Sequence, residues 1–291
     1  MTNKIIAFIK HYNVVPQTFQ ENLILKFSLI LLVLDGSTGW GLDVFMRIIC
    51  VIMLAFNNYI ANKLLWLLIS FFLIFFNSLQ FYSLDNHKIL FTYWILLITV
   101  YLWTGKNIGY IKNNARLMIG LVMFFAVLQK FLNGFHTPGF LHGRFLIDGR
   151  FMLVTNFITQ TPYEELFENQ KDVSLLNYLP IDNSYINLTN SLYLSRILYC
   201  FQIFGLIFEA IVAALFLFIK KENTIKDIAL ITFCIGTYFI FPVLGFSSIL
   251  LLLGIGQTNV KYSIYYIIAF ILLQFIMVPW QESIFYFKNS L

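Results

Sequence analysis

The chain has 291 residues, of which 59% are apolar and only 11% are charged, whereas a soluble domain carries about 25% charged residues. This composition, with 33 Phe and 16 Tyr, excludes a disordered chain, a nucleic-acid-binding module and a disulfide scaffold, because none could keep so much apolar surface from water. The sequence predicts an integral membrane protein, and its formal charge of +5 then bears on its orientation in the lipid bilayer.

The predicted fold is all-α and polytopic, with about eight transmembrane helices, since hydrocarbon about 30 Å thick needs roughly 20 apolar residues per helix. A cytoplasmic segment, residues 1–21, precedes a helical membrane domain, residues 22–291. The expected helices are residues 22–40, 42–56, 64–79, 89–104, 117–131, 197–219, 228–253 and 262–277. Charged residues interrupt the first two, which could be tilted or interfacial. Pro242 and Gly245 predict a kink or a break in the seventh.

Basic residues in the short loops predict the orientation, because cytoplasmic loops carry an excess of Lys and Arg. With a cytoplasmic N-terminus, only Lys88 and Lys261 of these loops face outside. Ten basic residues face inside, namely Lys4, Lys10, Lys63, Lys106, Lys112, Arg116, Lys220, Lys221, Lys226 and Lys288. Residues 132–195 then form one long external loop. The bias toward Asn, Lys and Ile indicates an AT-rich bacterial genome, so we expect the bacterial inner membrane.

Two polar residues are expected at the outer ends of neighbouring helices. Lys130 ends the fifth helix among phenylalanines. It could snorkel to the lipid headgroups, or it could be partly desolvated so that its neutral amine acts as a base. His87 begins the fourth helix. It could be an ordinary surface residue, or it could share the outer face with Lys130, because the fourth and fifth helices are antiparallel.

Glu209 lies deep in the sixth helix, where lipid makes an unpaired carboxylate costly. It must be protonated, paired or facing water, and it is a candidate for function or for stabilising a helix contact. Gln129, beside Lys130, and Gln202, about two turns before Glu209, are candidate hydrogen-bonding partners across helices, in a mainly structural role.

The external segment 136–151 contains His142 and Arg144 among glycines and apolar residues. These two side chains could line a substrate pocket, or they could be solvated at the membrane surface. His136 and His142 are six residues apart with no Cys or HExxH motif near them, so we expect no metal site.

Two stretches carry a resemblance to a known family. They are DNHKILFTYWILLI, which contains His87, and FFAVLQKFLNGF followed by FLHGRF, which contains Lys130. Over residues 45–255 the chain resembles the vitamin K-dependent gamma-carboxylase group, also called the horizontally transferred transmembrane (HTTM) family, as a reduced bacterial-type member. We expect it to lack the large extracytoplasmic domain of the animal enzyme. Cys234 stands where many members have a histidine.

The resemblance implies that His87 and Lys130 are catalytic, as the family's functional histidine and base lysine, and that Glu209 takes the place of an acidic residue. It implies a carbon–carbon lyase that uses reduced vitamin K or menaquinone, oxygen and carbon dioxide to carboxylate a glutamate of a secreted peptide at the outer membrane face. Two alternatives remain open. One is a non-catalytic accessory protein for maturation or export of a secreted peptide or toxin, and the other is a small-solute transporter that depends on Glu209.

Overall fold

The computed structural model of the chain describes residues 18–35, 41–79, 82, 85–105, 107–137, 141, 145, 151–159, 168, 171, 192–240 and 243–289. Within these ranges the regular structure is helical and no strand is formed, as expected for an all-α protein. Residues 1–17 of the expected cytoplasmic segment, and most of the expected external loop, lie outside the described residues. The described part of that loop includes α8 (Met152–Thr159).

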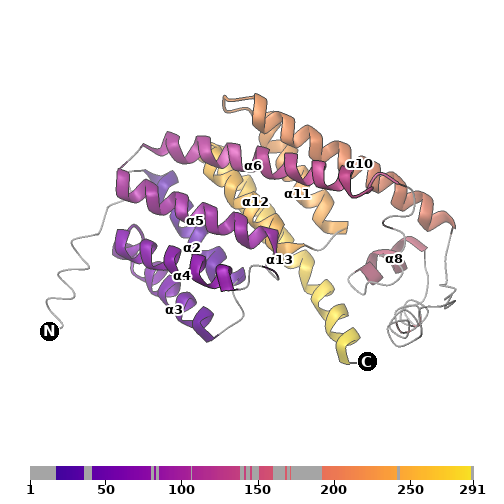
Figure 1. Cartoon of the computed structure of the whole chain (residues 1–291), viewed down its shortest axis with the longest axis horizontal. Helices are drawn as coiled ribbons and strands as arrows, with labels where there is room; N and C mark the ends of the chain where they lie inside the picture. Colours follow the sequence, from indigo (N-terminus) through magenta and orange to yellow (C-terminus); the bar gives the residue numbers. More distant parts are fainter. Residues whose placement is uncertain are drawn as a thin grey trace. The chain divides into compact units, whose positions relative to one another are not determined.

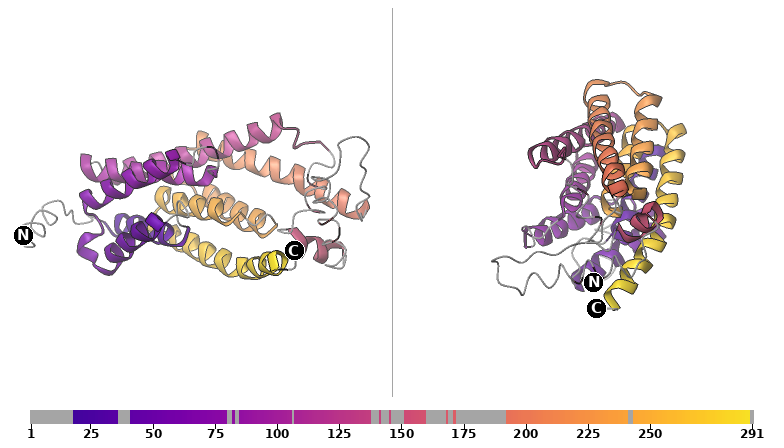
Figure 2. Two further views of the ribbon diagram at one scale, coloured as in Figure 1. Left: turned by 60° about the horizontal axis from the view of Figure 1, so that its bottom comes forward. Right: turned by 90° about the vertical axis from the view of Figure 1, so that its right-hand side faces the viewer.

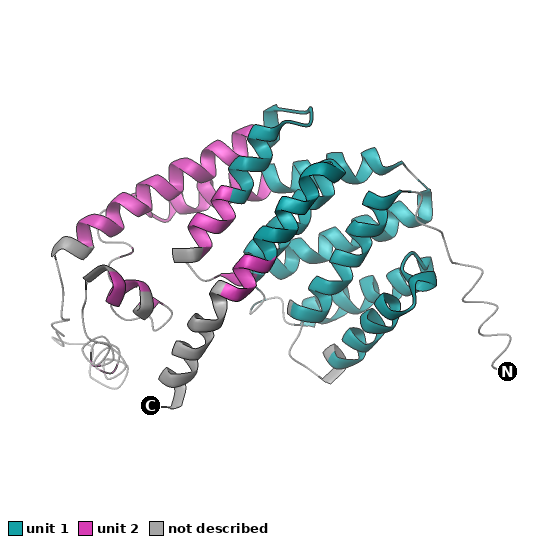
Figure 3. Cartoon of the chain, turned by 180° about the vertical axis from the view of Figure 1, so that it is seen from behind, with its two compact units in different colours: residues 1–120, 216–231, 245–270 teal, residues 121–215, 232–244, 271–291 magenta. Residues whose placement is uncertain are grey.

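The chain divides into two compact units (Figure 3). Unit 1 consists of Met1–Gly120, Phe216–Ile231 and Gly245–Phe270. Unit 2 consists of Leu121–Leu215, Thr232–Leu244 and Ile271–Leu291. Each unit therefore combines segments that lie far apart in the sequence.

Unit 1 begins with two pairs of packed helices, which Figures 1 and 2 show side by side. The members are α2 (Phe19–Asp35) with α3 (Gly41–Ala55), and α4 (Lys63–Leu79) with α5 (Asn86–Thr104); the 3-10 helix η1 (Asn57–Tyr59) lies between the pairs in sequence. Hydroxyl groups bridge the helices. Ser70 and Thr99 join α4 to α5 at 2.7 Å, and the indole of Trp94 donates to Ser28 of α2 at 2.9 Å. Such bonds satisfy polar groups that lipid would leave unpaired.

Three helices are long and apolar enough to cross a membrane, namely α5, α6 (Ile108–Leu132) and the Ser195–Phe218 part of α10 (Leu192–Phe218). Their outward faces carry large apolar side chains, among them Phe125, Phe204 and Ile207, which are 58%, 64% and 54% exposed. Apolar side chains exposed in this way are what lipid tails would cover. The other apolar segments found in the described residues are only 10–17 residues long, among them Val260–Phe275, so the expected total of eight crossings stays a prediction.

The expected seventh helix is two helices, α11 (Thr224–Ile240) and α12 (Leu244–Gln257), which confirms the break predicted near Pro242 and Gly245. Residues 228–253 therefore do not form one helix, and the number of times they cross a membrane stays a prediction. The end of α12 returns to the start of α11, where the Gln257 amide donates to Asp227 at 2.6 Å. The predicted orientation, with its excess of basic residues on the cytoplasmic side, stays a prediction.

The Asp227 carboxylate joins the start of α11 to the end of α12 and to α13 (Val260–Asn289). Besides Gln257, it accepts hydrogen bonds from the hydroxyl groups of Thr258, at 3.0 Å, and Tyr266, at 2.8 Å. Its side chain is buried. Burial raises the pKa of Asp227, and the three donated hydrogen bonds act in the opposite direction because they favour the carboxylate.

Two glycines let aromatic side chains approach α12 closely. A Cβ on Gly254 would overlap the ring of Tyr266, and a Cβ on Gly256 would lie 2.7 Å from the ring of Trp94. Both aromatic side chains are fully buried. Small residues at such contacts allow helices to pack tightly in a membrane protein.

Replacing Gly254 by alanine should therefore destabilise the protein by about 1–3 kcal/mol, because Tyr266 is buried and hydrogen-bonded and cannot move aside freely. Gly236→Ala is the matched control. It makes the same change inside α11, where a new Cβ meets nothing within 4 Å, and should be neutral or stabilising by about 0.5–1 kcal/mol. Unfolding in mixed detergent micelles, followed by circular dichroism, measures both changes. Equal effects of the two substitutions would contradict the packing described for α12.

The raised pKa of Asp227 predicts a pH dependence of stability. The folded state keeps the proton at pH values where the unfolded state, with a pKa of about 3.9, has released it. The free energy of unfolding of the wild type should therefore fall relative to that of Asp227→Asn as the pH rises above about 4, and should level off above the folded-state pKa.

Glu222→Gln is the control of opposite sign, because the hydrogen bond from Lys112 lowers the pKa of Glu222. Stability provided by Glu222 is present above its unfolded-state pKa and is lost as the pH falls through the lowered pKa. Denaturation at a series of pH values gives the unfolding free energy of the wild type relative to Asp227→Asn and relative to Glu222→Gln. These two differences should change with pH in opposite directions. A common slope would mean that Asp227 is not desolvated as described.

Candidate functional site

Lys130 and Glu209, two of the residues singled out by the sequence, form an ion pair within unit 2. Lys130 lies in the last turn of α6, and Glu209 lies well inside α10. The Lys130 side chain is 33% exposed and the Glu209 side chain only 7%. Glu209 is thus paired, which was one of the three states expected for an acid at this depth.

The end of α6 is built by a glycine-containing turn that positions Lys130. Gly134 has a positive φ of 71°, and its N–H donates to the carbonyl of Phe131 at 3.2 Å. The N–H of Phe135 donates to the carbonyl of Lys130 at 2.9 Å. These two bonds form a Schellman motif, which ends a helix and folds the next residues back over its last turn.

As a result of this turn, the ring of Phe135 lies under the Lys130 ammonium, with Nζ 5.2 Å from the ring centroid. Phe135 is not among the site residues predicted from the sequence. The signal that could have found it is the Asn–Gly–Phe sequence after the last apolar turn of the helix, because glycine at this position is typical of a helix end.

Gln202 holds the same turn from α10. Its side-chain amide donates to the carbonyl of Phe135 and, at 2.9 Å, to that of Thr137, and the residue is buried. The sequence predicted that Gln202 bonds across helices; its acceptors are instead backbone carbonyls of the turn that follows α6. Glu209 and Gln202 are about two helical turns apart, so α10 holds both Lys130 and the turn that follows it.

The second oxygen of Glu209, Oε2, is buried and has no hydrogen-bond partner among the described residues. A buried acceptor without a partner is uncommon, and it requires a physical reason. The Glu209 side chain is only 7% exposed. The site therefore combines an amine with a buried carboxylate, one oxygen of which no described residue satisfies.

His87 lies in the first turn of α5 in unit 1, and its imidazole contacts the backbone of α12 where Gly245 has no side chain. A Cβ at Gly245 would overlap the ring. Lys130 belongs to unit 2, so a site shared by His87 and Lys130 stays a prediction. Asp85 occupies the N-cap position of α5, without a capping hydrogen bond from its side chain.

The other residues that the sequence singled out either take no part in the ion pair or lie outside the described residues. Gln129 is exposed on α6, and His142 and Arg144 lie outside the described residues. The His136 ring stacks on Phe131, with 4.9 Å between ring centroids. In the part of the chain that the structure describes, no group of three or more His, Cys, Asp or Glu residues could hold a metal ion.

Comparison with protein-family models, with curated proteins and with solved structures finds no match to this chain. The resemblance to the HTTM family therefore stays a prediction based on the two sequence stretches around His87 and Lys130.

The ion pair predicts unequal effects of its two halves on stability. Lys130→Met leaves a buried carboxylate without its cation, whereas Glu209→Leu leaves a lysine that is one-third exposed and can extend toward the headgroups. The lysine substitution should therefore cost more, and the double variant should recover about 1–3 kcal/mol relative to the sum of the single effects.

A double-mutant cycle of unfolding free energies in mixed micelles measures this coupling. Additive single effects would show that the two side chains do not interact.

Proposed function

We propose that this chain is an integral membrane protein that uses the Lys130–Glu209 pair for proton transfer from a lipid-soluble hydroxyl compound. The reaction we propose is quinone-linked and resembles carboxylation of a peptide glutamate by the gamma-carboxylase family. The observation that carries the proposal is the pairing of these two side chains on apolar helices, next to an oxygen of Glu209 that has no partner in the described structure.

A lysine acts as a base only as a neutral amine, and in water its pKa of about 10.4 keeps it protonated at pH 7. The Glu209 carboxylate can accept a proton from the Lys130 ammonium. When the proton crosses the hydrogen bond, the ammonium and carboxylate become an amine and a carboxylic acid. Two neutral groups are less costly than two ions in apolar surroundings. Lys130 would then be able to take a proton from a bound substrate.

The surroundings of the pair suit a reduced quinone. The hydroxyl group of this compound would donate its proton to the neutral Lys130 amine, beside Oε2 of Glu209, which has no partner among the described residues. The ring could approach through the bilayer along exposed apolar side chains at the end of α6, namely Leu128, Phe131 and Leu132. When bound, a reduced quinone supplies reducing equivalents and, with oxygen, the strong base that the family reaction needs to remove a γ-proton from glutamate. The residues of this chain hold the hydroxyl group and accept its proton.

The proposal predicts formation of quinone epoxide that depends on Lys130. The purified full chain in lipid nanodiscs is given reduced menaquinone or vitamin K, oxygen and bicarbonate, and the epoxide is measured by chromatography. Lys130→Met should lower the rate by about 10²-fold or more, the usual contribution of a general base. Glu209→Gln should also lower the rate, because a neutral amide cannot accept the proton.

Lys261→Met is the matched control, since Lys261 is an exposed lysine that also lies near an aromatic ring, that of Tyr262 at 5.8 Å. It should leave the rate unchanged. No epoxide from folded wild-type protein, or epoxide that survives Lys130→Met, would overturn the proposal.

A transporter is the second candidate. The observation that favours it is the reversal between the short helices α11 and α12, because short or interrupted hydrophobic helices often form substrate sites in transporters. Proton-coupled uptake into liposomes that is lost in Glu209→Gln, without epoxide formation in the wild type, would support transport. Normal function of both Lys130→Met and Glu209→Gln in the native cell would instead support a non-catalytic accessory protein.

A further inference from the structure

Unit 1 contains a cavity of about 210 Å³, lined mainly by charged side chains from α6, from the connection between α10 and α11, and from α11 itself. The charged lining residues are Lys112, Arg116, Lys220, Lys226 and Glu222. Four positive groups and one negative group leave a formal excess of three positive charges. The volume is far larger than the roughly 10–15 Å³ that a single water needs, so the cavity has room for a polyatomic ion.

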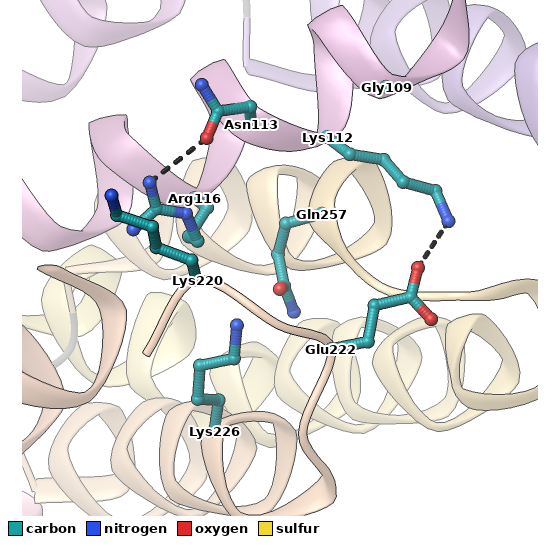
Figure 4. A pocket seen from close by; sticks show the side chains of 8 residues that line it. All are labelled: Gly109, Lys112, Asn113, Arg116, Lys220, Glu222, Lys226 and Gln257. Carbon is teal, nitrogen blue, oxygen red and sulfur yellow. Dashed lines mark hydrogen bonds and ion pairs between the residues drawn. The ribbon is translucent and has the colours of Figure 1, made fainter. Parts of the chain in front are cut away.

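One of the four cations is neutralised within the cavity wall. Lys112 donates to Glu222 at 2.6 Å, and the other oxygen of Glu222 accepts from Asn259 at 3.3 Å. Figure 4 shows this pair on one side of the cavity and Arg116, Lys220 and Lys226 gathered on the other. The positive excess therefore lies with these three residues.

Arg116 is only 5% exposed and is held by neutral groups. Its guanidinium donates to the carbonyls of Phe216, at 2.5 Å, and Leu217, at 3.2 Å, and to the side-chain oxygen of Asn113, at 3.0 Å. Its Nε is buried and has no hydrogen-bond partner in the described structure. The last turn of α10 explains the two carbonyl bonds, because a cation at a helix C-terminus is favourable. It does not explain the unpaired Nε.

Lys226 is only 1% exposed. Its ammonium donates to the carbonyl of Ile219 at 3.1 Å and lies 5.6 Å from the ring centroid of Phe216. Burial, followed by the charge of Arg116, lowers the pKa of Lys226, whereas the charges of Asp227 and Glu222 act in the opposite direction. Asp227 is adjacent in sequence, but its two oxygens accept from Gln257, Thr258 and Tyr266. A buried charge is costly unless it is paired, and an anion in the cavity would supply the pairing.

We propose that this cavity binds a phosphate group through Arg116, Lys220 and Lys226. A guanidinium and two ammonium groups are a donor set that matches the tetrahedral oxygens of phosphate. A phosphate monoester carries a charge of about −1.5 to −2, which offsets about half to two-thirds of the positive excess. All three residues belong to the side predicted to be cytoplasmic. The phosphate can belong to a soluble compound or to a lipid headgroup, since basic pockets between helices on this side bind such headgroups.

The test compares two neighbouring lysines in the full chain. Lys220 lines the cavity, whereas Lys221 is an exposed lysine of the same connection that does not line it. Binding of inorganic phosphate to protein in neutral lipid nanodiscs is measured by calorimetry, with chloride at the same ionic strength as the reference. Lys220→Gln should weaken binding by about tenfold or more, the effect of one charge-assisted hydrogen bond, and Lys221→Gln should leave it unchanged.

Lys226→Met provides a second variant, because it removes a buried charge without removing the Arg116 bonds that end α10. It should weaken phosphate binding at least as much as Lys220→Gln does. Equal weakening by Lys220→Gln and Lys221→Gln would show diffuse attraction to a basic surface and would overturn the proposal.

A second arm replaces some of the neutral lipid by phosphatidic acid and measures the thermal unfolding midpoint. A rise in the midpoint that requires Lys220 and Lys226, without binding of inorganic phosphate, identifies a lipid headgroup. Phosphate binding without a lipid effect identifies a soluble ligand. Absence of both effects in folded wild-type protein would overturn the proposal. The outcome is independent of the Lys130 reaction, because the cavity contains none of the residues assigned to that reaction.

Discussion

A charge or polar group buried in an apolar protein needs a partner, and this constraint organises both units of the structure. In unit 2 it joins Lys130 of α6 to Glu209 of α10. In unit 1 it brings the end of α12 and the start of α13 to the Asp227 carboxylate at the start of α11. Removing one partner of such a group costs more free energy of folding than the intact pair contributes. The positions of these helices are therefore coupled to a few polar contacts.

Helix ends bring much of the chemistry into place. The Schellman motif after α6 folds Phe135 back under the Lys130 ammonium, and the last turn of α10 presents carbonyl groups that hold Arg116. The terminal carbonyls of a helix lack partners within the helix, so they are available to a turn or to a cation. In an apolar chain with few charged residues, these ends are natural places for functional groups to gather.

Most individual elements could be predicted from hydropathy, because a run of about 20 apolar residues is a strong signal for a helix in a membrane protein. The prediction over residues 228–253 was wrong in one respect, since the chain reverses there and forms α11 and α12. Pro242 and Gly245 signalled the break. They did not signal the reversal, because a kinked helix and a helical hairpin have the same apolar composition. The reversal depends on contacts such as that between Gln257 and Asp227.

By itself, the sequence determined the apolar helical character of this protein and the small set of polar residues that require partners, Lys130 and Glu209 among them. Only the tertiary structure decided which groups meet. Lys130 and Glu209 are 79 positions apart, and the cavity in unit 1 combines residues from Gly109 to Gln257. The reason is that periodicity reports which face of a helix is apolar, whereas the pairing of two distant charges depends on how the helices pack.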